Sequence, residues 1–153
     1  MHRSMASVLC GLAIAGAVAA CAGNNKEIEV QGGDPELAAI AGDWTGEYTG
    51  IESGRTGTSH FSLELGRHTA EGNIFMGPSQ TPLKISFVAV EHGTVNGSIP
   101  PYTDPSCQCQ VETKFIGKLE GDSISGTFTT TVVGTDKIQH GTWHATRDAK
   151  KTE

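Results

Sequence analysis

The chain has 153 residues and a formal net charge of −6, with 11 lysines and arginines against 17 aspartates and glutamates. This length is typical of one domain, and the acidic balance argues against a nucleic-acid partner, because phosphate binding requires an excess of basic side chains. Only 18% of the residues are charged and 37% are hydrophobic, a composition that argues against a disordered chain.

Residues 1–20 have the composition of a secretion signal. Arg3 supplies a positive charge, and residues 5–20 follow without any charged side chain. These sixteen residues are fewer than the roughly 20 that a membrane-spanning helix needs. A basic start, a short apolar segment and small residues at its end predict a signal peptide that is removed on export.

The end of this segment, Val18-Ala19-Ala20-Cys21, resembles the lipobox of bacterial lipoproteins. The resemblance implies that the Cys21 thiol is lipidated by acyl chains of the palmitate type and that Cys21 becomes the first mature residue. Two acyl chains hold a protein stably on a membrane. Because Ala22 and not aspartate follows, the resemblance further implies a cell-envelope protein on the outer membrane, facing the periplasm. The alternative is ordinary secretory cleavage near Ala20.

Residues 21–40 are expected to contain the lipidated Cys21 and a flexible tether. The stretch over 22–34 shows no useful periodicity. Residues 35–41 can form one or two turns of helix, because Asp34 is a good N-cap and proline suits the first helical position. Gly42 would end that helix.

The rest of the chain, 41–148, is predicted to be one β-domain followed by a short tail, 149–153. Apolar and polar residues alternate with a period of two between glycine-containing turns, the pattern of half-buried strands. The pattern predicts eight strands, near 43–50, 58–65, 70–76, 83–91, 94–99, 109–119, 123–133 and 137–147. Short connections favour an all-β fold, an eight-stranded antiparallel up-and-down barrel. The alternative is a β-sandwich.

A glycine followed two residues later by an apolar residue recurs along the predicted strands. The glycines are Gly46, Gly72, Gly97, Gly126 and Gly141. Glycine weakens a strand, so its repetition indicates bends or close approach of other groups to the backbone, as in a closing sheet. The alternative is that the chain is simply rich in glycine.

Gly42-Asp43-Trp44, which opens the first predicted strand, is similar to the Gly-x-Trp motif of the lipocalin and avidin-like (calycin) barrels. In those families the tryptophan closes one end of the barrel and an arginine from the last strand packs over it. The resemblance implies that Trp44 and Arg147 form such a structural lock, with a cation–π contact between them. It does not imply a particular ligand.

Eight-stranded barrels are either filled by side chains or hold one small ligand. By alternation, several aromatic residues point inward and are candidates for contact with a ligand. These are Tyr48, Phe61, Phe87, Phe115 and Trp143. A barrel filled by its own side chains is the alternative.

Cys107 and Cys109 are the two thiols that lipidation of Cys21 and removal of Cys10 would leave. In an exported protein they are candidates for a disulfide with each other, if a turn after Pro105 brings them together. Two free thiols, a metal site and an intermolecular bond are the alternatives. The preceding segment, 99–106, contains three prolines and is expected to be an irregular loop.

The sequence contains none of the short motifs typical of hydrolases, metalloproteases or nucleotide-binding enzymes. We therefore expect a protein that is not an enzyme and has no catalytic residues, cofactor or metal. The expected function is that of a lipid-anchored lipoprotein whose calycin-like barrel binds a small apolar ligand. The alternative is a structural or protein-interaction lipoprotein with a packed barrel; its protein partner is not indicated.

Overall fold

The computed structural model describes residues 27–77 and 80–149, without the side chains of Thr81 and Phe87. The predicted signal peptide, Cys21 and most of the predicted tail lie outside these residues. The elements are β1 (Ile28–Gln31), α1 (Asp34–Ile40), β2 (Gly42–Gly50), β3 (Thr56–Leu63), β4 (Thr69–Met76), β5 (Thr81–Lys84), β6 (Phe87–Glu91), β7 (Thr94–Asp104), β8 (Cys109–Glu120), β9 (Ser123–Val132) and β10 (Ile138–Arg147).

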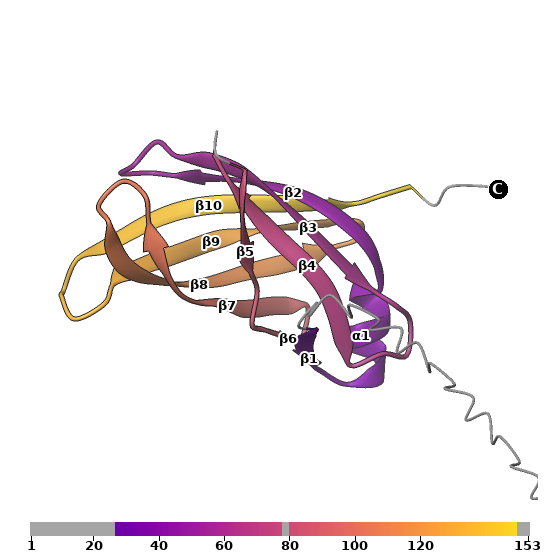
Figure 1. Cartoon of the computed structure of the whole chain (residues 1–153). Coiled ribbons are helices and arrows are strands. Elements are labelled where there is room, and N and C mark those ends of the chain that lie inside the picture. Colours follow the sequence, from indigo (N-terminus) through magenta and orange to yellow (C-terminus); the bar gives the residue numbers. More distant parts are fainter. Residues whose placement is uncertain (1–26, 78–79, 150–153) are drawn as a thin grey trace, which may run out of the picture.

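The strands form one closed, mixed β-barrel (Figure 1). Hydrogen bonding runs in the order β1-β6-β7-β8-β9-β10-β2-β3-β4 and returns from β4 to β1, while β5 extends from the far half of β4. All pairs are antiparallel except β1 with β6, which are parallel. The all-β class and the barrel are as predicted, but nine strands close the ring and they are not all antiparallel.

The ninth strand, β1, comes from the segment that the sequence analysis assigned to the tether. Ile28 and Val30 alternate with polar residues, and each is only 1% exposed. Ile28 pairs with Ala70 of β4, and Val30 pairs with Val88 of β6. An alternation of only four residues is too short to predict a strand from the sequence. In the structure these residues pair with both β4 and β6, which do not pair with each other.

The strand predicted over 83–91 is divided in two. Leu83 belongs to β5 and Val88 to β6, and the break falls at Ile85 and Ser86. Ser86 donates its backbone N–H to the carbonyl of Ser98 at 2.9 Å, although it lies outside the strands. The break lets β5 remain on β4 while β6 crosses to β1 and β7. It also changes the buried positions from odd-numbered residues, Leu83 and Ile85, to even-numbered ones, Val88 and Val90.

The irregular loop predicted over 99–106 is mostly strand. β7 continues to Asp104, with a bulge between Ile99 and Tyr102 that accommodates Pro100 and Pro101. This part of β7 pairs only with β8, so the prolines lie where no second neighbour needs their missing N–H groups.

The two ends of the barrel differ. α1 and the turns at 64–68, 92–93 and 121–122 lie at one end, called here the closed end, where Leu37 and Ile40 of α1 are buried in the main core. The loops at 51–55, 105–108 and 133–137 surround the opposite end, called the mouth (left in Figure 1). Within the described residues, no helix has the length and apolar character needed to cross a membrane.

Candidate functional site

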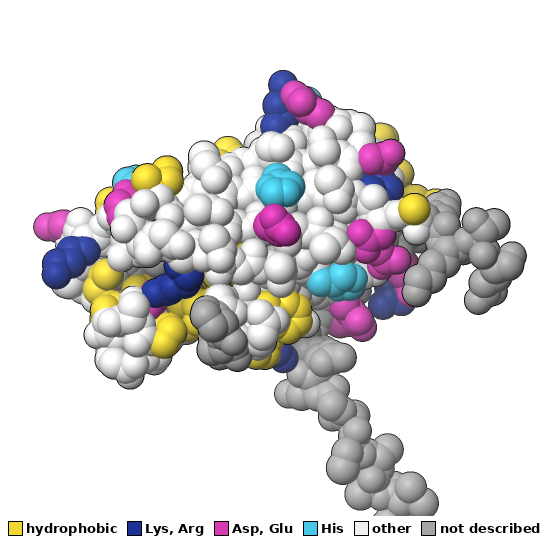
Figure 2. All heavy atoms as spheres, turned by 90° about the horizontal axis from the view of Figure 1, so that it is seen from above, with side chains coloured by type: hydrophobic (Ala, Val, Ile, Leu, Met, Phe, Trp, Pro, Cys, Tyr) yellow, Lys and Arg dark blue, Asp and Glu magenta, His cyan; other side chains and the backbone are white. Residues whose placement is uncertain are grey.

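The barrel encloses a cavity of about 130 Å³. Its inner part is lined by apolar side chains, among them Ile40, Trp44, Val95, Ile124 and Ala145. Polar side chains line the part nearest the mouth. Figure 2 shows hydrophobic side chains in a hollow of the surface, with a basic side chain lying across them.

Trp44 and Arg147 close the inner end. The Arg147 guanidinium carbon lies 4.3 Å from the centre of the Trp44 ring. Trp44 is 2% exposed and donates its indole N–H to the carbonyl of Ile40 at 2.8 Å. The two residues that the family resemblance singled out therefore lie in contact beneath α1.

Arg147 also binds the end of α1. Its guanidinium donates to the carbonyls of Ala39 (2.7 Å) and Ala41 and to the carboxylate of Asp122 (2.8 Å). The last carbonyls of a helix have no partners within the helix and carry partial negative charge, so a guanidinium there supplies both hydrogen bonds and charge complementarity. The arginine thus joins helix, tryptophan and the β8–β9 turn.

Large aromatic rings lie against glycines of neighbouring strands. A Cβ added at Gly57 would overlap the Tyr48 ring, and one at Gly97 or Gly141 would overlap the ring of Phe115 or Phe128 respectively. Each pair is directly cross-strand. The rings lie along the barrel wall because no side chain occupies these positions, which leaves space in the lumen. This close approach gives a physical role to Gly97 and Gly141 of the predicted repeat.

The Trp143 ring also lies against a glycine, but on a strand that is not its direct neighbour. A Cβ added at Gly117, two strands away, would come close to its indole ring. The indole N–H points to the carbonyls of Ile116 and Thr127, at 3.2 Å each. Its ring also meets Phe115 edge to face, with centroids 5.6 Å apart.

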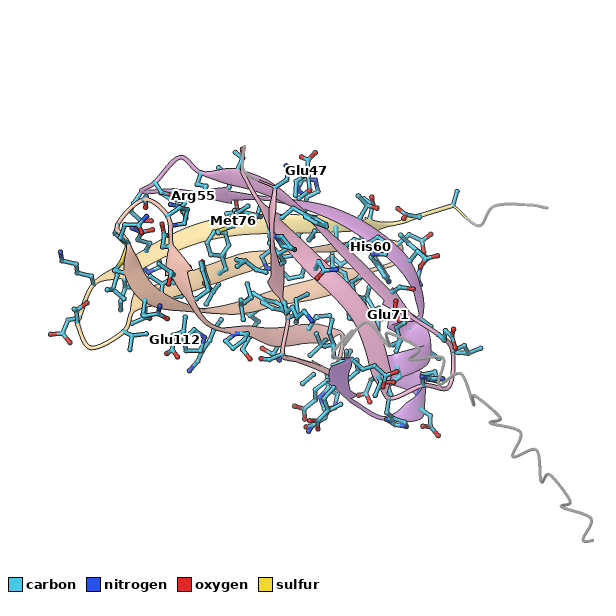
Figure 3. All side chains as sticks on the ribbon, viewed as in Figure 1. Glu47, Arg55, His60, Glu71, Met76 and Glu112 are labelled. Carbon is cyan, nitrogen blue, oxygen red and sulfur yellow. A yellow bond between two sulfur atoms is a disulfide. The ribbon has the colours of Figure 1, made fainter. Side chains whose placement is uncertain are left out.

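An ion pair between Arg55 and Asp104 lies at the mouth. The guanidinium contacts both carboxylate oxygens, Nη1 to Oδ2 at 2.6 Å and Nη2 to Oδ1 at 2.8 Å. Ser106 donates its N–H and its hydroxyl to Oδ1 and accepts from Nη2. Arg55 and Met76 lie in the same half of the barrel, while Glu71 lies nearer α1 (Figure 3).

This pair changes the chemistry of both groups. The Asp104 side chain is only 5% exposed, yet hydrogen bonds from Arg55, and then from Ser106, lower the pKa of that carboxyl from 3.8 to about 2. The pKa of Arg55 is raised in turn by its hydrogen bond to Asp104. Both groups are therefore ionised at any physiological pH, and a bidentate pair of this kind has a fixed geometry.

Sequence reasoning missed Arg55 and Asp104. Arg55 ends a hairpin loop and Asp104 lies within the segment expected to be irregular, so neither falls in a predicted alternating pattern. The usable signal was the Asp104-Pro105 pair, because an aspartate before proline favours a turn in which the carboxylate accepts the backbone N–H two residues on.

Hydroxyl groups continue from the ion pair into the lumen. Tyr102 lies 3.5 Å from the Thr113 hydroxyl, which lies 2.7 Å from the Thr130 hydroxyl. Thr113 and Thr130 are buried, 5% and 7% exposed. Burial raises the pKa of both Tyr48 and Tyr102, so their hydroxyls stay protonated.

Cys107 and Cys109 are joined by a disulfide in the turn between β7 and β8. Their Cα atoms are 5.1 Å apart, because Gln108 between them takes a positive φ of 53°. The Gln108 N–H donates to the carbonyl of Asp104 at 2.8 Å. The disulfide therefore closes the same turn that places Ser106 against Asp104.

Four of the five aromatic residues predicted to face a ligand line the cavity, and the side chain of the fifth is not described. Tyr48, Phe61, Phe115 and Trp143 are part-buried and line the cavity. Phe87 lies in β6, but its side chain is outside what the structure describes. No group of three or more histidine, cysteine, aspartate or glutamate side chains suited to a metal ion occurs among residues 27–77 and 80–149.

No protein-family model matches the chain, and no curated protein matches it in sequence.

Proposed function

We propose that this protein is an exported lipoprotein, anchored through Cys21, whose barrel binds a small and mainly apolar molecule. The observation that carries the proposal is the cavity, which is apolar inside, closed by Trp44 and Arg147 at one end and polar at the mouth. Ligand sites in proteins typically combine apolar walls with a few placed polar groups.

The size of the cavity supports a ligand of about one ring. Its volume is about 130 Å³, close to the roughly 150 Å³ of an engineered apolar cavity that binds benzene. A long acyl chain or a large cofactor would need more room. We therefore propose that the cavity binds a small molecule and not an entire lipid.

The proposed anchor is compatible with access of a small molecule to the mouth. Glu27, the first described residue, lies 3.4 Å from Arg67 in the β3–β4 turn at the closed end. A lipid on Cys21 would then hold the closed end toward the membrane, and the mouth would open toward the aqueous space, where a small molecule can diffuse to it.

Native mass spectrometry of the protein extracted from membranes tests this function. We expect a small bound molecule that dissociates at higher collision energy. Ala145→Leu, which adds volume to the cavity wall, should reduce its occupancy, whereas Thr146→Leu, on the exposed face of the same strand, should not. Equal occupancy in both variants would contradict binding in the lumen, and no bound molecule in the wild type would contradict the proposal.

A protein-interaction role is the second candidate. Three large apolar side chains are exposed at the mouth, in the loop at 51–55, in the loop at 133–137 and at the start of β10. They are Ile51 (68% exposed), Val133 (49%) and Ile138 (51%). Three of the five large apolar side chains that are exposed in the described part of the chain therefore lie at the mouth, which favours a protein contact there. Cross-linking in intact cells should then capture a partner through residues beside Ile138, and a monomeric, unlinked protein would count against this role.

A further inference from the structure

The charged groups that line the cavity cancel each other. Of the described lining residues, Arg55, Asp104 and His60 can carry charge. His60 is exposed on its strand, while Arg55 and Asp104 form the bidentate pair. The cavity and its mouth therefore present one positive and one negative charge in direct contact, with no net charge left for a ligand.

A charged ligand would meet an unfavourable environment here. A carboxylate would need Arg55, whose Nη1 and Nη2 already bind Asp104 and Ser106. An ammonium would need Asp104, whose oxygens already accept four hydrogen bonds from Arg55 and Ser106. If either ion displaced one member of the Arg55–Asp104 pair, the other member would lose its counter-charge. If the pair stayed intact, the ion would lose its hydration shell without gaining a counter-charge.

Several polar side chains in the lining remain available to a ligand, those of Tyr48 and Gln139 among them. Tyr48 and Gln139 line the cavity, and the side chain of neither makes a hydrogen bond to a residue in the described part of the chain. Tyr48 approaches Phe128 edge to face, with centroids 5.8 Å apart, so its ring is held in place. A protonated phenol and a primary amide can each donate and accept a hydrogen bond.

We propose that the cavity selects uncharged molecules of about single-ring size that carry one hydrogen-bonding group, because Arg55 and Asp104 neutralise each other at its mouth. This inference rests on the proposed function and names the class of ligand. Apolar walls hold the ring, and Tyr48 or Gln139 binds the polar group.

Matched probes test the inference on the full chain, by isothermal titration calorimetry with a protein-free detergent blank. The probes are toluene, para-cresol, benzoate and benzylammonium. We expect para-cresol to bind about threefold to tenfold more tightly than toluene, and each charged probe to bind at least about tenfold more weakly than para-cresol. Replacing both groups, in the double variant Tyr48→Phe with Gln139→Leu, should remove most of the difference between para-cresol and toluene.

Variants of the ion pair provide the sharper test. Arg55→Met leaves the Asp104 carboxylate without its cation, so benzylammonium should gain at least about tenfold in affinity. Asp104→Asn leaves Arg55 without its anion, so benzoate should gain instead. The controls are Lys137→Met and Asp136→Asn, which make the same charge changes on an exposed loop at the mouth, and neither gain should appear there. Thermal melts identify any variant that does not fold, in which case the wild-type probe series decides.

The outcomes separate the two proposals. If no probe binds the wild type, the proposed binding function is wrong. If charged and uncharged probes bind equally well, or a charged probe binds best, the cavity binds ligands but the selection for uncharged molecules is wrong. If toluene and para-cresol bind equally in the wild type, the hydrogen-bonding role of Tyr48 and Gln139 is wrong.

Discussion

Asp104 is the residue whose ionisation contributes most clearly to stability. Its pKa is about 2 in the folded protein, against an ordinary value of 3.8. A lowered carboxyl pKa stabilises the fold fully above the unfolded value, near pH 4, and this contribution is lost as the pH falls toward 2. The shift corresponds to about 2 kcal/mol.

Urea unfolding between pH 6 and 2.5 checks this expectation. Asp104→Asn should reduce the free energy of unfolding above pH 4 by about 2 kcal/mol and should flatten its fall in acid. Asp136→Asn is the control, because Asp136 is exposed and makes no ion pair within the described residues. A wild-type acid slope retained in Asp104→Asn would show that Asp104 is not the group responsible.

Gly97 is the residue that best tests how the lumen is kept open. Gly97→Ala places a methyl group where the Phe115 ring lies, which should lower the free energy of unfolding by about 1–3 kcal/mol. Phe115→Leu removes the ring, so the double variant should be more stable than the sum of the single effects predicts. Strict additivity in chemical denaturation would contradict the proposed contact.

At the scale of elements, Arg147 adds a polar attachment to the apolar contacts that hold α1 on the barrel. Arg147→Lys keeps the positive charge but loses the flat guanidinium that stacks on Trp44 and binds two helix carbonyls. We expect a loss of about 1–3 kcal/mol in thermal or chemical unfolding. Arg67→Lys, in an exposed pair with Glu27, should change stability by less than about 0.5 kcal/mol. Equal effects would show that the lock has no special role.

The regular strands were predictable because their buried faces repeat every second residue. β8 and β9 follow the predicted ranges closely, since Val111 and Ile124 each lie between two polar neighbours. β1 and the break at Ser86 could not be found in this way, because each depends on which distant strand lies beside it. Tertiary pairing, and not local pattern, decides such positions.

The candidate site was predictable only in part, for a similar reason. Aromatic residues such as Tyr48 and Trp143 stand out by alternation and do line the cavity. The ion pair joins residues 49 positions apart, one at a hairpin end and the other after a bulge. Nothing in either neighbourhood of the sequence indicates the other, so this part of the site appears only when the barrel is closed.

At the scale of the whole molecule, attachment to a membrane is expected to depend on one thiol. Cys21→Ser removes the proposed acyl acceptor, so the protein should move from the membrane fraction to the soluble fraction of the cell envelope. Cys10→Ser is the matched control, because Cys10 lies in the segment predicted to be removed and should leave the distribution unchanged. Fractionation with immunoblotting measures both, and a membrane-bound Cys21→Ser protein would overturn the anchor.

The strand that closes the barrel is also the first described element after the proposed anchor, and this determines what proteolytic release can yield. A cut between Ile28 and Gln31 would free the domain from the membrane and also remove the strand that joins β4 to β6. The product would be an open sheet with two exposed edges, prone to pair with other chains. A cut on the N-terminal side of Glu27 would leave the barrel closed, so release of a closed barrel and release of an open sheet are separated by a few peptide bonds.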